Sequence, residues 1–435
     1  MPESSAVPAP TERGTPVAEA AWEGHDGRSV ARLHSLTREG DRAQATLTIG
    51  GREHVLSHRV VGGEPADGYA PFVAAAVPIA MRTARGLNVD GPVAPRQLEG
   101  LAGVQRILSG WYAELAPVEI EAAAPPNGRP WAERGTACFF SAGLDSFYSV
   151  LRNLEHLDSL IFIHGFDVLL EDAEMRERVA DLARRTAAAF GLELVEVETD
   201  IKNVSRRYCR WGDQYHGAML ASVGLLLADR FERVLIPGSA PATLLHPWGS
   251  HPDLDPLWSS DAVEFVHDGA VTRAEKLELV KDSPVALDNL RVCFQRGTGE
   301  LNCGRCEKCL RTMVGLKVAG ALERCSTLPD EVPLDRLART PIPTDFLLQR
   351  ASENAAAAET AGDLELAAAL RRMMRDGPGR AAKLEARKRR RRTIDRRLRG
   401  AKRRARRVRR WARRRRRRTR RALAQLKRRL SLGSV

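Results

Sequence analysis

The chain has 435 residues, of which 43% are hydrophobic and 29% charged, so it is long enough for several domains and apolar enough to bury a core. Its net charge of +14 is unevenly placed, because residues 383–435 hold 28 basic and 2 acidic side chains whereas residues 1–382 hold 41 basic and 53 acidic ones. No apolar stretch is long enough to span a bilayer and no secretory signal opens the chain, so we expect a cytoplasmic protein without a transmembrane segment.

The first part of the chain predicts a small α+β domain behind a disordered start. Residues 1–25 are rich in Pro, Ala, Ser and Glu and lack apolar periodicity, which is typical of disorder. Period-two alternation then predicts a strand whose buried face carries Ala45, Leu47 and Ile49. Two helices, the first interrupted or kinked by its proline, and a short strand are expected over 69–85, 95–115 and 118–121. We assign residues 26–121 to this domain and expect no catalytic cluster in it.

Strands and helices alternate from residue 134 onward. Apolar runs predict strands over 136–141, 160–164, 192–197, 234–237 and 263–267. Between and after them, helices are predicted over 144–154, 173–190, 214–229 and 272–280. This alternation is typical of an α/β fold, a doubly wound parallel sheet with helices on both faces. We assign residues 134–325 to this domain, 326–382 to a helical extension and 383–435 to an arginine-rich tail, helical or disordered.

The segment after the first of these strands has the properties of a phosphate-binding loop. Residues 138–146 read CFFSAGLDS, which is an apolar strand, a loop of small residues and the start of a helix. Free backbone N–H groups and hydroxyls at such a junction bind anions, and Gly143 lets the backbone approach them closely. A carboxylate such as Asp145 suits a Mg²⁺ ion at a pyrophosphate.

This loop resembles the S-G-G-x-D-S signature of the PP-loop ATP pyrophosphatase superfamily. The resemblance implies that ATP and Mg²⁺ bind to Ser141, Ala142, Gly143, Leu144, Asp145 and Ser146. His164, at the end of the second strand of this domain, lies where an α/β protein binds nucleotides, with a core or capping role as the alternative. Ala142 replaces the first glycine of the signature, which leaves open an inactive nucleotide-binding module.

Four of the seven cysteines are spaced as metal ligands. Cys293, Cys303, Cys306 and Cys309 form C-x9-C-x2-C-x2-C, which predicts a closed, structural zinc knuckle over residues 293–309. An iron–sulfur cluster is the chemical alternative, because thiolates alone do not select the metal. The remaining cysteines are expected to be buried apolar side chains: Cys138, Cys209 and Cys325.

A PP-loop followed by this cysteine spacing resembles 7-cyano-7-deazaguanine synthase, over about residues 134–325. Residues 272–276 (TRAEK) resemble that family's T-K-A-E-I stretch. The resemblance implies an ATP-dependent C–N ligase that adenylates a small carboxylate, 7-carboxy-7-deazaguanine or a related acid, releases pyrophosphate and transfers ammonia or an amine. We take Asp145, Ser146 and Lys276 as its candidate catalytic residues. The family's S-G-Y-P-D-C-R wording is absent from 239–260, so the acid is not identified.

Several side chains are further candidates to contact the adenylate or the acceptor. They are Arg273, His246, His251, Asp253 and Asp255, with solvated loop charges or turn caps as the alternative. Stacking on a base or burial in a loop core is expected for Trp248 and Trp258. The basic tail predicts binding of nucleic acid or another polyanion, which leaves an RNA-modifying PP-loop enzyme as a second interpretation.

Overall fold

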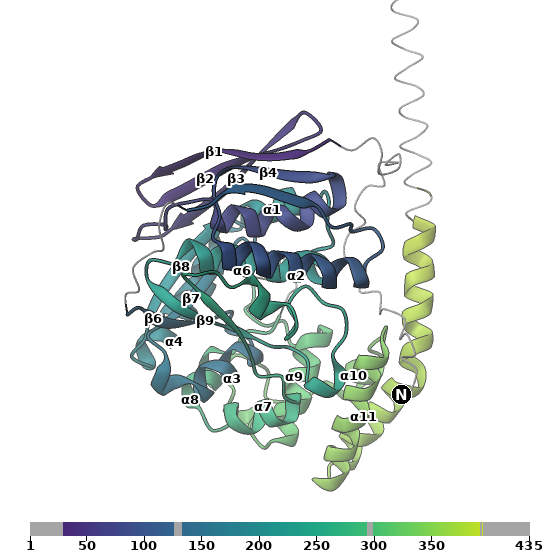
Figure 1. Ribbon diagram of the computed structural model, residues 1–435. Coiled ribbons are helices and arrows are strands. Elements are labelled where there is room, and N and C mark those ends of the chain that lie inside the picture. Colours follow the sequence, from purple (N-terminus) through teal and green to yellow (C-terminus); the bar gives the residue numbers. More distant parts are fainter. Residues whose placement is uncertain (1–28, 126–132, 294–298, 392–393, 395–435) are drawn as a thin grey trace, which may run out of the picture. The chain divides into compact units, whose positions relative to one another are not determined.

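The computed structural model describes residues 29–125, 133–293, 299–391 and residue 394 (Figure 1). The segment 1–25 and the tail beyond residue 394 lie outside these residues, so the disorder and the basic tail stay predictions. The chain divides into two compact units, one ending at Pro333 and one beginning at Leu334. None of the helices in the described ranges combines the length and apolar character that a membrane span needs.

The first unit is built on one sheet. Its strands are β1 (Ala31–Glu39), β2 (Arg42–Ile49), β3 (Arg52–Val60), β4 (Gly86–Pro92), β5 (Glu119–Ala123), β6 (Gly135–Phe139), β7 (Ser159–His164), β8 (Glu193–Thr199), β9 (Phe231–Pro237) and β10 (Glu264–Asp268). They lie in the order β10-β9-β6-β7-β8-β3-β2-β1-β4-β5. The α-helices described in this unit are α1 (Ala70–Thr83), α2 (Pro95–Trp111), α3 (Leu144–Arg152), α4 (Ala173–Ala189), α5 (Ile201–Ser205), α6 (His216–Leu226), α7 (Arg273–Val280), α8 (Pro284–Asn289) and α9 (Glu307–Val318).

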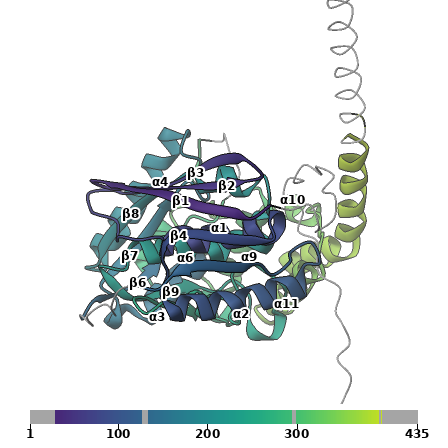
Figure 2. The same ribbon diagram turned by 45° about the horizontal axis from the view of Figure 1, so that its top comes forward.

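Strands β6 to β10 form the parallel half of the sheet. The chain passes from β6 through β7 to β8, returns to the other side of β6 for β9, and continues to β10. Figure 2 shows β8, β7, β6 and β9 following one another across the sheet. The strand order therefore reverses between β6 and β9. The predicted α/β class with a largely parallel sheet is confirmed, and the predicted strands and helices of this half are present to within a few residues.

The N-terminal strands continue the same sheet. The last residues of β3 pair antiparallel with β8, with Arg59 opposite Glu198. Strands β1 to β3 are antiparallel to one another, and β4 and β5 run parallel to β1. The predicted alternation in β2 is confirmed, since Ala45, Leu47 and Ile49 are all buried. Strand β4 was not predicted, because its sequence GLNVDGP has glycine at two positions and little alternation.

Helix α1 is buried on nearly every side and packs on α6. It continues through Pro78 without a break, so the predicted split at this proline is wrong, and the alternative, a kink, stays a prediction. Proline at position 78 removes the N–H that would bond to the Ala74 carbonyl. Two other carbonyls of the helix bond to buried side chains. Tyr215 donates its hydroxyl hydrogen to the Ala75 carbonyl at 2.6 Å, and the Cys209 thiol lies 3.4 Å from the Pro78 carbonyl.

The second unit is helical where it is described. Its helices are α10 (Leu334–Ala338), α11 (Asp345–Thr360) and a helix over residues 364–391. Thr344 caps α11 by accepting a hydrogen bond from the Leu347 N–H at 3.3 Å. Gly362 follows α11 with a φ of 77°, a conformation that ends helices.

Candidate functional site

The loop between β6 and α3 lies where the strand order reverses, at the carboxyl ends of the parallel strands. Ligands of open α/β sheets bind at this place. Two hydroxyls line the loop: Ser146 Oγ donates to the Gly143 carbonyl at 3.0 Å and lies 3.4 Å from Ser141 Oγ. The Gly143 N–H in turn donates to Ser141 Oγ at 3.4 Å. The loop is therefore small, polar and placed at the start of α3, which suits an anion.

Ala142, where the signature has glycine, adopts the conformation that favours glycine. Its φ is 59°, and it is fully buried. The left-handed region costs an L-residue roughly 1–2 kcal/mol, so the surrounding contacts must hold this residue in place. One such contact is a 2.7 Å hydrogen bond from the Arg291 N–H to the Ala142 carbonyl. The loop thus keeps the backbone shape of a glycine-containing loop despite the methyl group.

The variant Ala142→Gly is expected to change the free energy of unfolding by less than about 1 kcal/mol. Relief of the left-handed strain, roughly 1–2 kcal/mol, offsets the extra unfolded-state entropy of glycine, roughly 0.5–1 kcal/mol, and the loss of one buried methyl group, roughly 0.8 kcal/mol. Urea denaturation measures the difference. The matched control is Ala137→Gly, since Ala137 is equally buried but lies in β6 without a positive φ, and this variant is expected to lose stability. Equal losses in both variants would contradict the assigned strain.

Asp145 and Lys276, two of the predicted catalytic residues, are in direct contact. Lys276 is 1% exposed, and its Nζ lies 2.6 Å from Asp145 Oδ1 and also donates to the Gly238 carbonyl. Helix α7, which carries Lys276, packs on α3 and begins with a capping box between Thr272 and Glu275. The TRAEK motif therefore starts a helix and delivers a buried ammonium to the phosphate-loop side of β9.

Three cations that the sequence analysis did not select act on one carboxyl beyond β7. Crowding by neighbouring protein atoms would by itself raise the pKa of Asp167, but the charges of Lys308, Arg291 and Lys202, with a smaller contribution from His216, hold it below its usual value. Asp167 is nonetheless reached by solvent. Arg291 is buried, and among the described residues its Nε has no hydrogen-bond partner. Positive charge thus gathers at the carboxyl edge that holds the loop.

His164 ends β7 as predicted, but both its ring nitrogens face charged protein groups. Its Nε2 lies 2.8 Å from Glu196 Oε2, and its Nδ1 lies 3.5 Å from Arg176 Nε. Burial would raise the pKa of Glu196, yet hydrogen bonds from His164 and Arg184 outweigh it and lower that pKa to about 2. His164 therefore belongs to an ion-pair network between β7, β8 and α4, and its contact with a nucleotide stays a prediction.

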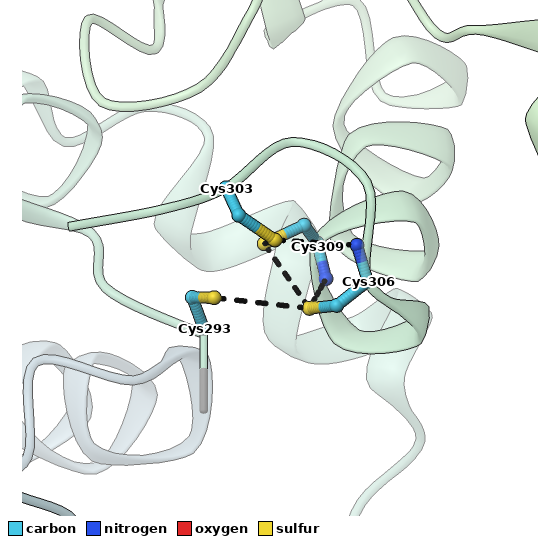
Figure 3. A group of neighbouring side chains, drawn as sticks. All are labelled: Cys293, Cys303, Cys306 and Cys309. Carbon is cyan, nitrogen blue, oxygen red and sulfur yellow. Dashed lines mark hydrogen bonds between the residues drawn. The ribbon is translucent and has the colours of Figure 1, made fainter. Parts of the chain in front are cut away.

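The four predicted metal-ligand cysteines lie together and are buried (Figure 3). All four sulfurs lie within 4.8 Å of one another, with separations of 3.9 Å for Cys293–Cys306, 4.0 Å for Cys303–Cys309 and 3.5 Å for Cys306–Cys309. In a zinc tetrathiolate with bonds of about 2.3 Å, the sulfurs lie ~3.8 Å apart. The cluster therefore has the size and ligand chemistry to hold a metal ion. No other such group of His, Cys, Asp or Glu is found in the described part of the chain.

The local backbone stabilises thiolates and fixes the turn. The Cys306 N–H donates to Cys303 Sγ at 3.3 Å, and the Cys309 N–H donates to Cys306 Sγ at 3.5 Å. Hydrogen bonding from Cys309 lowers the pKa of Cys306 below its usual range, and the shared proton raises that of Cys309. Gly304 has a φ of 63°, and a side chain there would meet Pro329 at 2.8 Å. The turn therefore requires glycine.

Asn302 joins the cysteine cluster to the segment that contacts the phosphate loop. Its Oδ1 accepts from the N–H groups of Val292 and Cys293 at 2.9 and 3.1 Å, and its Nδ2 donates to the Leu290 carbonyl at 2.8 Å. Arg291, whose N–H bonds to the loop, lies inside this segment. The cysteine cluster and the phosphate loop are therefore linked through one short, hydrogen-bonded stretch of chain.

The structure brings together some of the remaining candidates from 239–260 and α7 and separates others. Asp255 is fully buried and Asp253 is exposed in its side chain. Arg273 points to α9, where its guanidinium donates to Thr312 Oγ1 at 2.7 Å. Trp258 is buried in the core, whereas His246, Trp248 and His251 line a small pocket with Ser239 and His267.

Sequence reasoning missed His267, Arg291, Lys202 and Lys308. His267 lies near the end of β10, so the rule that selected His164 also applies to it. Arg291 and Lys308 lie beside the cysteine ligands in sequence, which could have indicated their place. Lys202, in α5 after β8, has no local motif.

The comparisons with known proteins give no relative. No protein-family model, no curated protein and no solved structure matches the chain. The function is therefore inferred from the geometry of the site.

Proposed function

We propose that the protein is an ATP-dependent C–N ligase of the PP-loop type, with the doubly wound fold of that superfamily. The observation that carries the proposal is the Ser141–Ser146 loop at the reversal of strand order, flanked by the Asp145–Lys276 pair. The cations around Asp167 support it, because a triphosphate brings several negative charges to this edge. On this proposal the loop N–H groups, Ser141 and Ser146 bind the phosphates of ATP.

The proposed reaction has two steps. An oxygen of the substrate carboxylate attacks the α-phosphorus of ATP, and pyrophosphate leaves. The nitrogen of ammonia or an amine then attacks the acyl carbon, and AMP leaves with the electrons of the C–O bond. The protein contributes positioning and charge: Lys276 and Arg291 offset the negative charge that builds on the departing pyrophosphate.

Mg²⁺ fits the site as the partner of ATP. Asp145 is partly exposed, and Lys276 is bonded to Oδ1, so Oδ2 has no described hydrogen-bond partner. Mg²⁺ is typically held by one or two carboxylates together with substrate phosphates. Asp145 would hold the ion, which when bound neutralises phosphate charge.

We propose zinc as the metal of the cysteine cluster and a structural role for it. Four sulfur ligands fill the tetrahedral coordination of the metal and leave no position for water, as in structural zinc sites. Through Asn302 and Arg291, the metal would hold in place the segment whose N–H bonds to the Ala142 carbonyl.

Exchange of labelled pyrophosphate into ATP in the presence of a substrate carboxylic acid tests the proposal. The full chain, purified with its metal, is incubated with ATP, Mg²⁺, labelled pyrophosphate and one small ring carboxylate at a time, including 7-carboxy-7-deazaguanine. We expect label to enter ATP only when the right acid is present, because adenylation is reversible before the amine arrives. Absence of ATP binding in calorimetry would exclude the ligase. ATP binding without exchange for every acid would favour an inactive module, and exchange supported only by RNA would favour the RNA-modifying interpretation.

A further inference from the structure

A small pocket lies beside the phosphate loop, at the carboxyl ends of β9 and β10. Rings of His246, Trp248 and His251 line it, together with Ser239 and His267. Gly238, which follows β9, lies next to both His267 of the pocket and Lys276 of the Asp145–Lys276 pair. The Gly238 carbonyl accepts from Lys276, and a side chain at this residue would come within 2.4 Å of His267 Nε2. The imidazole therefore lies against the same residue that the Asp145–Lys276 pair contacts.

His267 is paired with a buried carboxylate. Its Nδ1 lies 2.6 Å from Asp255 Oδ2, and Asp255 is fully buried. Because a carboxylate only accepts hydrogen bonds, the proton of this contact belongs to Nδ1. The lone pair of the neutral ring is then on Nε2. That atom is buried and, among the described residues, has no hydrogen-bond partner.

The surrounding loop holds the carboxylate in place. Asp255 also accepts from Ser250 Oγ at 2.8 Å and from the His251 N–H at 3.3 Å. The loop is seated on the start of α6, where the Gly217 N–H donates to the Gly249 carbonyl at 2.8 Å. A side chain at Gly217 would meet that carbonyl at 2.0 Å, so the loop approaches α6 as closely as backbone allows. Orientation of an imidazole by a fixed carboxylate is the arrangement found in acid–base pairs.

We propose that His267 is the proton acceptor of the amine-transfer step and that Asp255 orients it. The inference rests on the proposed ligase function and concerns its second step. The amine nitrogen forms a bond to the acyl carbon, the bond from that carbon to the AMP oxygen breaks, and a proton of the amine moves to His267 Nε2. The Asp255 carboxylate stabilises the imidazolium that results. The adenylation step needs no such base.

Other titratable groups surround the pair. They are His216, His246, His251, Asp213 and Asp253. Burial lowers the pKa of His216 and of His251 below the value of an ordinary imidazole.

The test separates the two chemical steps in the full-length protein. In His267→Gln we expect the exchange of pyrophosphate into ATP to stay near the wild-type rate, whereas amide formation falls about 10²–10⁴-fold. His156→Gln, at an exposed histidine, is the matched control.

The outcomes distinguish this inference from the proposed function. If the wild type exchanges pyrophosphate and His267→Gln still transfers the amine at the wild-type rate, only the role of His267 is overturned. If none of the carboxylic acids supports exchange of pyrophosphate into ATP by the wild type, the ligase function is excluded, and the amine-transfer step is excluded with it. Should His267→Gln fail to fold, Asp255→Asn replaces it, with the same expected division between the steps. Nitrogen NMR of labelled histidines shows which ring nitrogen of His267 carries the proton and needs no turnover. A proton on Nε2 of neutral His267 would overturn the inference, whichever variant is used.

Discussion

Cys309→Ser is expected to lose the bound zinc and, with it, most of the affinity for ATP. Structural zinc contributes roughly 10–16 kcal/mol of apparent binding free energy in small zinc domains, which is free energy of folding. Cys309 is fully buried in the cluster and lies on the first turn of α9. Without the metal, the sulfurs of Cys293 and Cys303 have nothing to hold them beside α9. The segment containing Arg291 would then leave the Ala142 carbonyl, and the phosphate loop would lose that support.

The measurements are metal content by mass spectrometry, thermal unfolding and ATP binding by calorimetry. The matched control is Cys325→Ser, because Cys325 is also fully buried but lies outside the cluster, bonded to the Leu287 carbonyl at 3.3 Å. This control should retain the metal. A Cys309→Ser protein with full metal content would show that the cluster is not the metal site. Iron content and visible absorption in the wild type would show that the cluster holds an iron–sulfur centre and not zinc.

Asp145→Asn is expected to reduce acid-dependent pyrophosphate exchange about 10²–10³-fold, the usual cost of removing one electrostatic contact at a reacting centre. The substitution keeps the shape of the side chain and an oxygen that accepts from Lys276. It removes the negative charge that would hold Mg²⁺ and leaves the buried ammonium of Lys276 without its counter-ion. The loss should therefore appear in the rate, in its Mg²⁺ dependence and in a lower melting temperature, because a buried ammonium without its counter-ion destabilises the fold.

Exchange rates across a range of Mg²⁺ concentrations, together with thermal unfolding, give this result. Asp181→Asn makes the same chemical change on the exposed face of α4, where its partner is Arg185, and should leave exchange unchanged. A wild-type rate in Asp145→Asn, at any Mg²⁺ concentration, would remove Asp145 from the mechanism.

Local patterns in the sequence predicted the parallel half of the sheet. The strands β6 to β10 are apolar runs separated by helical segments, and such runs are visible residue by residue. The cysteine cluster was predicted for the same reason, since Cys303, Cys306 and Cys309 follow one another at intervals of three residues. Both features depend on neighbours in sequence.

Contacts between distant segments were not predictable in this way. The pairing of β3 with β8 joins Arg59 to Glu198, and no local signal connects them. The proposed role of His267 depends on its contact with Asp255, which lies 12 residues earlier on a loop with little periodicity. The positive φ of Ala142 runs against the intrinsic preference of alanine, and tertiary contacts, among them the hydrogen bond from Arg291, hold the residue there.

The antiparallel join between β3 and β8 has a consequence for how the protein can be divided. Strand β8 is the last of the parallel strands on its side, and β3 covers its outer N–H and carbonyl groups. A fragment that begins at residue 134 would leave those groups uncovered, as a template on which a second copy could add its own strand. The N-terminal strands thus protect the end of β8 from pairing with a second copy.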